Sequence, residues 1–443
     1  MKPKISENQN KQQDFFKVQL VTFINMHHEL VRLADTMDWE EFCNKFGSSF
    51  NERQGRPGLP TRLMVGLTYL KYLFDLSDEE MLSRFICDPY VQYFCGYEFF
   101  QHTPPCDSSS LTRFRKRLGE EGAEKLLTET LAVGHKLGLI SVRECERVIV
   151  DTTVQEKNIT FPTDSKLINK SRENLVKHCK KRKIVLRQTY TFKGKREAHK
   201  CSRYLHARQY NRAQSSIRKQ KTMLGRVIRD IERKCSEQDT ELKDALILAK
   251  KIKWQDKNSK NKIYSVHEPH VECISKGKAR NPYEFGNKVS FTITAKNPWI
   301  IGAKALFGNP FDGATLKEAI QQTERLTGKE VKEIYVDKGY RGKNHHPDDR
   351  MVLISGRKKL RPILQKLLRR RSSIEPVIGH TKHDHRMKIN LLKGIDGDKI
   401  NPILAGSAFN LRKILRSFFF VFFCWLQKIK MEMEKSQLHL QIC

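Results

Sequence analysis

Apolar residues recur every three or four positions after residue 60, a spacing typical of an amphipathic helix. The members of this stripe are Leu63, Leu67, Leu70 and Phe74. Ser77 then stands three residues before Glu80, the spacing of a capping box at the start of a further helix. After a double proline, residues 107–110 offer several N-caps for a short basic helix. Residues 1–140 are therefore predicted to form a small, all-helical N-terminal domain.

The pattern changes at residue 147, where short runs of β-branched and aromatic residues begin. Strands are predicted at 147–154, 262–266, 286–294, 299–306 and 331–336. Residues 165–255 have a different pattern, which is helical and strongly basic. Within it Ile217, Leu224 and Ile231 repeat every seven positions, as expected for a long amphipathic helix. Further helices are expected at 313–326 and within 360–390.

This order of helices and strands indicates an α/β protein with a helical insertion. We expect a helical domain at 1–140 and an α/β domain at 141–416, with the basic insertion at about 165–255. Residues 417–443 would follow as an apolar and basic C-terminal tail.

The charge of the chain changes the picture more than its other composition does. The 443 residues include 83 Lys and Arg against 50 Asp and Glu, which gives a formal net charge of +33. So many positive charges repel one another unless the protein binds a polyanion. Nucleic acid is therefore the leading expected partner and an anionic membrane surface the second. The hydrophobic fraction of 38% still fits a globular chain and argues against a wholly disordered basic protein.

Neither the apolar run near the C-terminus nor the cysteines indicate a membrane or secreted protein. The run at 418–426 has less than half the length of a membrane-spanning helix, so a buried or interfacial segment is expected. No secretory signal opens the sequence. The 11 cysteines are scattered and form no CxxC pair, which fits a reducing cytoplasm and disfavours zinc ribbons.

Two aspartates occupy the same unusual setting. Asp151 follows the apolar residues 148–150, and Asp337 follows 334–336. An aspartate at the end of a buried strand is costly unless a cation or hydrogen bonds compensate it. Each could simply end its strand and cap a turn. Two such residues in a chain of this charge favour a metal site instead.

A third acid, Glu375, lies in a basic helical stretch. On a helix it would share a face with Arg371, one turn earlier, and Lys382 stands seven residues after it. Such a glutamate could serve a metal ion while its basic neighbours bind phosphates. An ordinary surface ion pair between Arg371 and Glu375 would explain the same pattern.

Six short segments add a more specific pattern through their order and spacing. They are 55–57, 150–154, 283–288, 308–313, 336–342 and 371–382. With them the chain resembles bacterial DDE transposases of the insertion-sequence-five group, within the wider insertion-sequence-four and -five set, over most of its length. The C-terminal signature of that family is Tyr, two residues, Arg, three residues, Glu, six residues, Lys. Arg371, Glu375 and Lys382 fit this spacing, whereas Leu368 stands at the Tyr position and Ala314 where a His is usual.

The resemblance implies a ribonuclease-H-like core. In such folds the first Asp lies on the central first strand, the second at or just after the fourth strand, and the Glu on a following helix. Asp151, Asp337 and Glu375 would be the catalytic residues and would hold two Mg²⁺ or Mn²⁺ ions for phosphoryl transfer on DNA. Arg371 and Lys382 would position DNA phosphates.

The implied partners are the terminal inverted repeats of an insertion sequence and a target DNA, and the implied assembly is a homodimer on paired ends. The N-terminal domain resembles a helix-turn-helix reader of these repeats. Its expected DNA contacts are Arg113, Arg115, Lys116 and Arg117. No membrane and no small-molecule substrate are expected. An inactive, DNA-binding relic and a nuclease without strand transfer are the alternative interpretations.

Overall fold

The computed structural model divides the chain into two compact units. It describes residues 18–47, 58–235, 239–256, 258–275, 282–347, 349–356 and 361–440, so the segment 55–57 lies outside the described residues. The first unit comprises Met1–Gln155, Lys288–Leu306 and Pro310–Cys443. The second comprises Glu156–Asn287 and Phe307–Asn309. No helix among the described residues combines the length and the apolar character needed to cross a membrane.

The first unit begins with helices that surround one nearly fully buried helix, α3. They are the 3-10 turn η1 (Leu20–Thr22) and α1 (Glu29–Thr36), α2 (Trp39–Gly47), α3 (Thr61–Leu73), α4 (Asp78–Cys87), α5 (Pro89–Phe94) and α6 (Ser108–Lys136). Ser77 and Glu80 form the predicted capping box at the start of α4. Helix α3 is less amphipathic than predicted. Almost all of its residues are buried, because α2, α4, α6 and the last helix, α14 (Gly394–Leu440), pack against it.

The strands of the first unit form a mixed sheet. They are β1 (Arg147–Lys157, preceded by η2, Val142–Glu146), β3 (Tyr283–Thr294), β4 (Ile300–Leu306), β5 (Glu333–Val336), β6 (Met351–Ile354) and β7 (Ile389–Asn390). Strand β1 lies between β3 and β5, β6 follows β5, β4 pairs with β3, and β7 pairs with β1. The β1–β5 and β5–β6 pairs are parallel, whereas β3 and β4 are antiparallel. The protein is therefore of the α/β kind.

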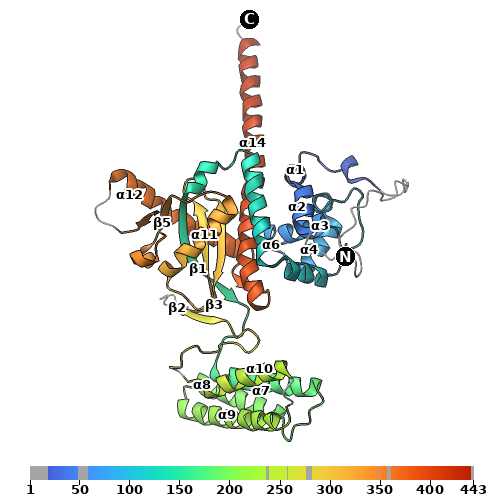
Figure 1. The fold of residues 1–443 in the computed structure, drawn as a ribbon. Coiled ribbons are helices and arrows are strands. Elements are labelled where there is room, and N and C mark those ends of the chain that lie inside the picture. The colour runs from blue at the N-terminus through green and yellow to red at the C-terminus, as the bar shows by residue number, and fades with distance from the viewer. Residues whose placement is uncertain are drawn as a thin grey trace. The chain divides into compact units, whose positions relative to one another are not determined.

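Helices and short turns connect and cover these strands. They are η3 (Asp312–Thr315), α11 (Leu316–Thr327), η4 (Lys338–Tyr340), η5 (Lys343–His345), α12 (Pro362–Arg369), η6 (Arg370–Ser373), α13 (Ile374–Asp384) and α14. Helix α14 runs along α6 and also packs on β4 (Figure 1). The buried side chain of Asn410 fastens it there, because its amide accepts a hydrogen bond from Ile300 N (3.0 Å) and donates to Ile300 O (2.8 Å).

One hydrophobic core extends through the first unit from Leu30 to Phe418. The N-terminal helices therefore share their core with the sheet, so residue 140, the predicted domain boundary, is not a boundary between compact units. The backbone of α14 likewise continues through residue 417, where a separate tail was expected. The physical reason is that α6 and α14 bury apolar faces against each other and against β4.

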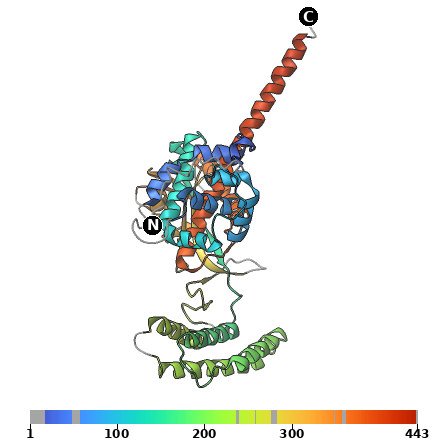
Figure 2. The same ribbon diagram turned by 90° about the vertical axis from the view of Figure 1, so that its right-hand side faces the viewer.

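The described residues of the second unit form four helices, which have a core of their own and are drawn in green in Figure 2. These are α7 (Asp164–Lys181), α8 (Thr191–His206), α9 (Tyr210–Glu232) and α10 (Thr240–Trp254), and they occupy the range where the basic insertion was expected. Leu224 and Ile231 of the seven-residue repeat are fully buried in this core. A short strand, β2 (Glu272–Ser275), pairs antiparallel with the first residues of β3.

The prediction of a strand at 262–266 is wrong. This segment has no regular secondary structure, although Ile263 and Val266 are buried as a strand would bury them. The side-chain amide of Gln255 takes the place of a neighbouring strand: it accepts from Ile263 N (3.0 Å) and donates to Ile263 O (3.2 Å). The helices of the second unit, rather than a sheet, therefore bury the side chains of Ile263 and Val266.

Candidate active site

Asp151 lies on β1, and Asp337 directly follows β5, the parallel neighbour of β1. In the β1–β5 ladder Ile149 pairs with Tyr335, and each aspartate comes two residues later along the chain. The charge of Asp337 acts on the carboxyl group of Asp151, so the two carboxylates lie near each other. Asp337 also caps η4, because its Oδ1 accepts a hydrogen bond from Gly339 N at 2.8 Å.

The carboxyl group of Asp151 lies in a negatively charged environment. Only 18% of its side chain is exposed, and this burial raises its pKa to about 6. The charges of Asp337 and Asp312 add to that increase. The backbone N–H of Thr152 and the guanidinium of Arg371 oppose it without cancelling it. Burial is therefore the main cause of the raised pKa, and the two neighbouring aspartates add to it.

Asp312 belongs to this cluster, although the sequence analysis did not select it. Its Oδ1 accepts hydrogen bonds from Thr152 Oγ1 (2.9 Å) and from Lys288 Nζ (3.1 Å). A Cβ atom on Gly339 would lie 3.2 Å from Asp312 Oδ2 and 3.0 Å from Asp337 Oδ1. The two carboxylates therefore approach the same side of Gly339, and a Cβ atom there would require them to shift by a few tenths of an ångström.

A buried tyrosine points into the same cluster. The Tyr340 side chain is 0% exposed, and its hydroxyl lies near the Thr152 side chain without a well-formed hydrogen bond among the described residues. Burial and the charges of Asp151, Asp312 and Asp337 raise the pKa of this phenol well above its usual value. Tyr340 therefore keeps its proton and offers a neutral O–H donor beside three carboxylates.

Glu375 reaches the edge of this site through Arg371. The Arg371 Nη2 atom lies 3.1 Å from Glu375 Oε1, and Nη1 lies 3.6 Å from Asp151 Oδ2. One guanidinium thus separates the two carboxylates. Glu375 itself, in the first turn of α13, has a side chain that is 63% exposed. Among the described residues, no group of three or more His, Cys, Asp and Glu side chains is placed so that it could hold a metal ion.

The other residues of the C-terminal signature lie on the same stretch of chain. Lys382 is half-buried on α13, about two turns after Glu375. Leu368, at the position where the family has Tyr, is partly buried and packs against the core of the first unit. Ala314 lies within η3, the same short turn that begins with Asp312.

The four basic residues predicted to bind DNA on α6 are in two different situations. Arg113, Lys116 and Arg117 have exposed side chains. Arg115 is buried, and its two terminal nitrogens donate to the carboxylate of Asp78 at 2.8 and 2.6 Å. Arg115 therefore joins α6 to the start of α4, and its side chain is not available to a DNA molecule at the surface.

Helix α6 also changes direction after these residues. Gly119 has non-helical angles (φ 61°, ψ −170°), so 108–118 form a separate basic segment before the apolar part of the helix. The left-handed φ of this position favours glycine. The short basic helix that the sequence predicts corresponds to this first segment.

Comparison with known proteins defines the class. Residues 18–117, from η1 to the basic segment of α6, match the family described as Transposase domain (DUF772). A protein of Rhizobium meliloti, "Uncharacterized protein ORF8 in nfe locus", is 49% identical over 197 residues, which are 44% of this chain and 95% of that protein. No solved structure matches this chain. The chain belongs to the same family as the Rhizobium meliloti protein, and its residues 18–117 carry the transposase domain.

Proposed function

We propose that this chain is a DDE transposase of the insertion-sequence-five group, which cleaves DNA strands at the ends of an insertion sequence and joins them to a target DNA. The observation that carries the proposal is that Asp151 on β1 and Asp337, directly after the parallel neighbour β5, lie near each other. The transposase domain at 18–117 and the sequence resemblance support the same conclusion.

The arrangement of strands supports a ribonuclease-H-like core. Strand β1, which carries Asp151, lies inside the sheet between β3 and β5. Asp337 follows β5, the fourth strand in chain order among those described in the first unit, after β1, β3 and β4. Glu375 comes later, on a helix. These positions support the placement of the three acids that we propose from the resemblance.

The residues present suit the two divalent ions that we propose. Proteins usually hold Mg²⁺ through one or two carboxylates together with phosphates of the substrate rather than through a complete cage. Asp151 and Asp337 supply such a pair, and their negative charge matches a cation. Glu375 would be the third acid. When bound, Mg²⁺ or Mn²⁺ would make a water or a DNA 3′-hydroxyl a better nucleophile and would neutralise charge on the leaving oxygen.

The neighbouring side chains hold these acids in place. Arg371 fixes Asp151 and Glu375 at its two ends, and its fork of N–H donors also suits a phosphate. Thr152 and Lys288 orient Asp312. The buried Tyr340 hydroxyl can donate a hydrogen bond toward the carboxylates. Lys382 would add a further positive charge for the DNA backbone.

DNA is the partner that we propose for the exposed basic residues of α6. Arg113, Lys116 and Arg117 would contact the terminal inverted repeats, whereas Arg115 is left out because it is buried. Action in the bacterial cytoplasm as a homodimer on paired ends belongs to the same proposal.

The proposal is tested by strand cleavage with the full chain. The substrate is a duplex made from the DNA that flanks the reading frame, with Mg²⁺ or Mn²⁺ added. We expect Asp151→Asn to lower the cleavage rate by more than about a hundredfold, because it removes charge from the proposed ion site while keeping the size of the side chain. The matched control is Asp244→Asn, an exposed aspartate on α10, which should cleave at the wild-type rate.

Three results would contradict the proposal in different ways. Full cleavage activity of Asp151→Asn would show that the assigned catalytic site is wrong. Binding without cleavage by the wild-type chain would indicate a DNA-binding relic. Cleaved ends without joined molecules would indicate a nuclease that lacks strand transfer.

A further inference from the structure

The second unit holds most of the excess positive charge of the protein. Residues 156–287 contain 34 Lys and Arg against 14 Asp and Glu, although they make up less than a third of the chain. The residues of the proposed active site belong to the first unit, and the roles proposed above use none of these basic residues. A charge of this size on a folded helical unit indicates contact with a polyanion.

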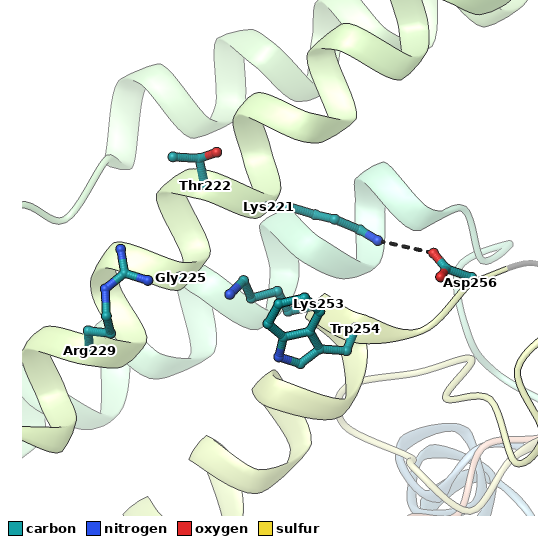
Figure 3. Close-up of a pocket in the computed structure, with 7 residues that line it drawn as sticks. All are labelled: Lys221, Thr222, Gly225, Arg229, Lys253, Trp254 and Asp256. Carbon is teal, nitrogen blue, oxygen red and sulfur yellow. Dashed lines mark hydrogen bonds and ion pairs between the residues drawn. The ribbon is translucent and has the colours of Figure 1, made fainter.

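A pocket of about 380 Å³ lies between α9 and α10 within this unit (Figure 3). Its lining is basic and contains one exposed aromatic ring. The lining residues are Lys221, Thr222, Gly225, Arg229, Lys253, Trp254 and Asp256. Asp256 is the acid among them, and Lys221 pairs with it at 3.5 Å. Neither Arg229 nor Lys253 forms an ion pair within the described part of the chain.

The two cations of Arg229 and Lys253 converge at Gly225. A Cβ atom on Gly225 would lie 3.0 Å from Lys253 Nζ and 3.5 Å from Arg229 Nη1. Like charges that approach each other without an acid between them are unfavourable, and a bound anion relieves the repulsion. The position of Lys253 in the last turn of α10 suits the helix dipole, but Arg229 lies within α9, so the dipole does not explain the convergence.

Trp254 separates this pocket from a second basic hollow. The tryptophan is 71% exposed, and Lys253 Nζ lies 4.2 Å from the centroid of its ring. The second hollow, of about 320 Å³, is lined by Lys250, Lys251, Trp254, Gln255, Ser259, Lys260 and Asn261. A large aromatic ring left in water between lysines is costly in a free protein, and it is the arrangement with which proteins stack unpaired bases while cations hold the backbone.

We propose that the α9–α10 pocket binds a phosphate of a DNA strand through Arg229 and Lys253, and that Trp254 stacks on an unpaired base of the same strand. The inference rests on the proposed function for the choice of DNA as the polyanion. It adds a second DNA site, distant in sequence from α6, that prefers single-stranded or unpaired DNA over a regular duplex. Recognition there would depend on charge and stacking and would not select a base sequence.

The test measures binding of the full chain to a fluorescent single-stranded oligonucleotide and to the matching duplex. Trp254→Ala should weaken single-strand binding about tenfold or more, and Trp254→Phe, which keeps a stacking ring, should restore most of it. Gly225→Ala leaves the charge unchanged and displaces Lys253 Nζ, so it should weaken binding severalfold. The matched control is Lys177→Gln, an exposed lysine of α7 that lines neither hollow, which should change affinity less than twofold.

Two further readouts separate stacking from general charge. Addition of the unlabelled oligonucleotide should quench tryptophan emission in the wild type and much less in Trp254→Phe. Lys253→Gln and Arg229→Gln should each reduce the slope of log affinity against log salt by about one. Equal losses of DNA affinity in Lys177→Gln and Lys253→Gln would contradict the proposed binding site. Unchanged quenching of tryptophan emission in Trp254→Phe would also contradict it. Tight binding of an acidic peptide with no binding of DNA would overturn the choice of partner.

The result is distinguishable from failure of the proposed function. If Asp151→Asn abolishes cleavage while Trp254→Ala binds single strands as the wild type does, the transposase assignment stands and the pocket fails. If no variant cleaves DNA but Trp254→Ala loses single-strand binding, the pocket stands without the catalytic assignment.

Discussion

The two units use charge in different ways. In the first unit the informative charges are buried and held by named partners, as Arg115 is by Asp78 and Asp151 by Arg371. In the second unit most basic side chains lie on the outside of four helices whose apolar residues form a separate core. A buried charge acts through its geometry, because its partner must stand at the right distance. An exposed charge acts mainly through its number and sign.

The ion pairs beside α4 show how strongly burial acts in the first unit. Asp78 accepts from both Arg115 and Lys71 (2.7 Å to Lys71), and all three side chains are largely shielded from water. Burial, followed by the charge of Arg115, lowers the pKa of Lys71 to about 8 in spite of its pairing with Asp78. The three residues therefore form one unit in which the loss of any partner leaves an uncompensated charge.

Arg115→Gln should have the largest effect on stability. It leaves the carboxylate of Asp78 buried with Lys71 alone, and breaking such a pair costs about 3–5 kcal/mol of unfolding free energy. Lys177→Gln, on the exposed surface of α7, should change that free energy by no more than about 0.5 kcal/mol. Denaturant unfolding followed by circular dichroism measures both. Similar values for the two variants would break the distinction between the units.

The pH dependence of stability should show a step of about 3 kcal/mol that belongs to His385. This side chain is 1% exposed, and burial lowers its pKa to about 4, with Arg412 acting in the same direction. The carbonyl of Tyr72, 3.0 Å from Nδ1, and the nearby Asp384 oppose that decrease. The unfolded chain takes up the proton near pH 6.5, so stability is complete above that pH and falls as the pH decreases toward 4.

The variant that isolates this step is His385→Gln. Its free energy of unfolding should lack the decrease between pH 6.5 and 4 that His385 causes in the wild type. His199→Gln, an exposed histidine on α8 of the second unit, should keep the full step. Unfolding curves at several pH values measure the difference between the two variants. A step that disappears in His199→Gln would show that burial does not decide the effect.

The smallest expected effect distinguishes two glycines of the first unit. Gly339→Ala should lower cleavage about tenfold with little change in stability, because its Cβ atom would displace the carboxylates of Asp337 and Asp312 by a few tenths of an ångström. Gly379→Ala, within α13, meets nothing within 4 Å and should stabilise the protein by up to about 1 kcal/mol without loss of cleavage. Equal cleavage by both variants would show that the spacing of the acids does not matter.

The sequence alone was enough to select two candidate site residues, the aspartates that follow apolar runs. An acid at the end of such a strand is unusual, so Asp151 and Asp337 could be selected from local pattern alone, and the parallel ladder aligns them. Asp312 was not selected as a site residue although it lies in the segment 308–313, because it does not follow an apolar strand as the other two aspartates do. Its place depends on a hydrogen bond from Thr152, 160 residues away along the chain.

Long-range packing also explains the other differences. Arg115 looked like its exposed neighbours until Asp78, 37 residues earlier, was placed against it. Residues 262–266 had the apolar composition of a strand, but a single glutamine side chain and the helices around them satisfied both their polar and apolar groups. The shared core of α6, α14 and the sheet joined regions that composition had separated.

The place where the second unit interrupts the first has a consequence for how such proteins change over time. The chain departs at the end of β1 and re-enters within β3, and these two strands are neighbours in the sheet. An ordinary tight hairpin could join them just as well. Whole modules could thus be gained, exchanged or discarded at this junction by recombination, while the remaining architecture kept its strand pairing and its three aspartates.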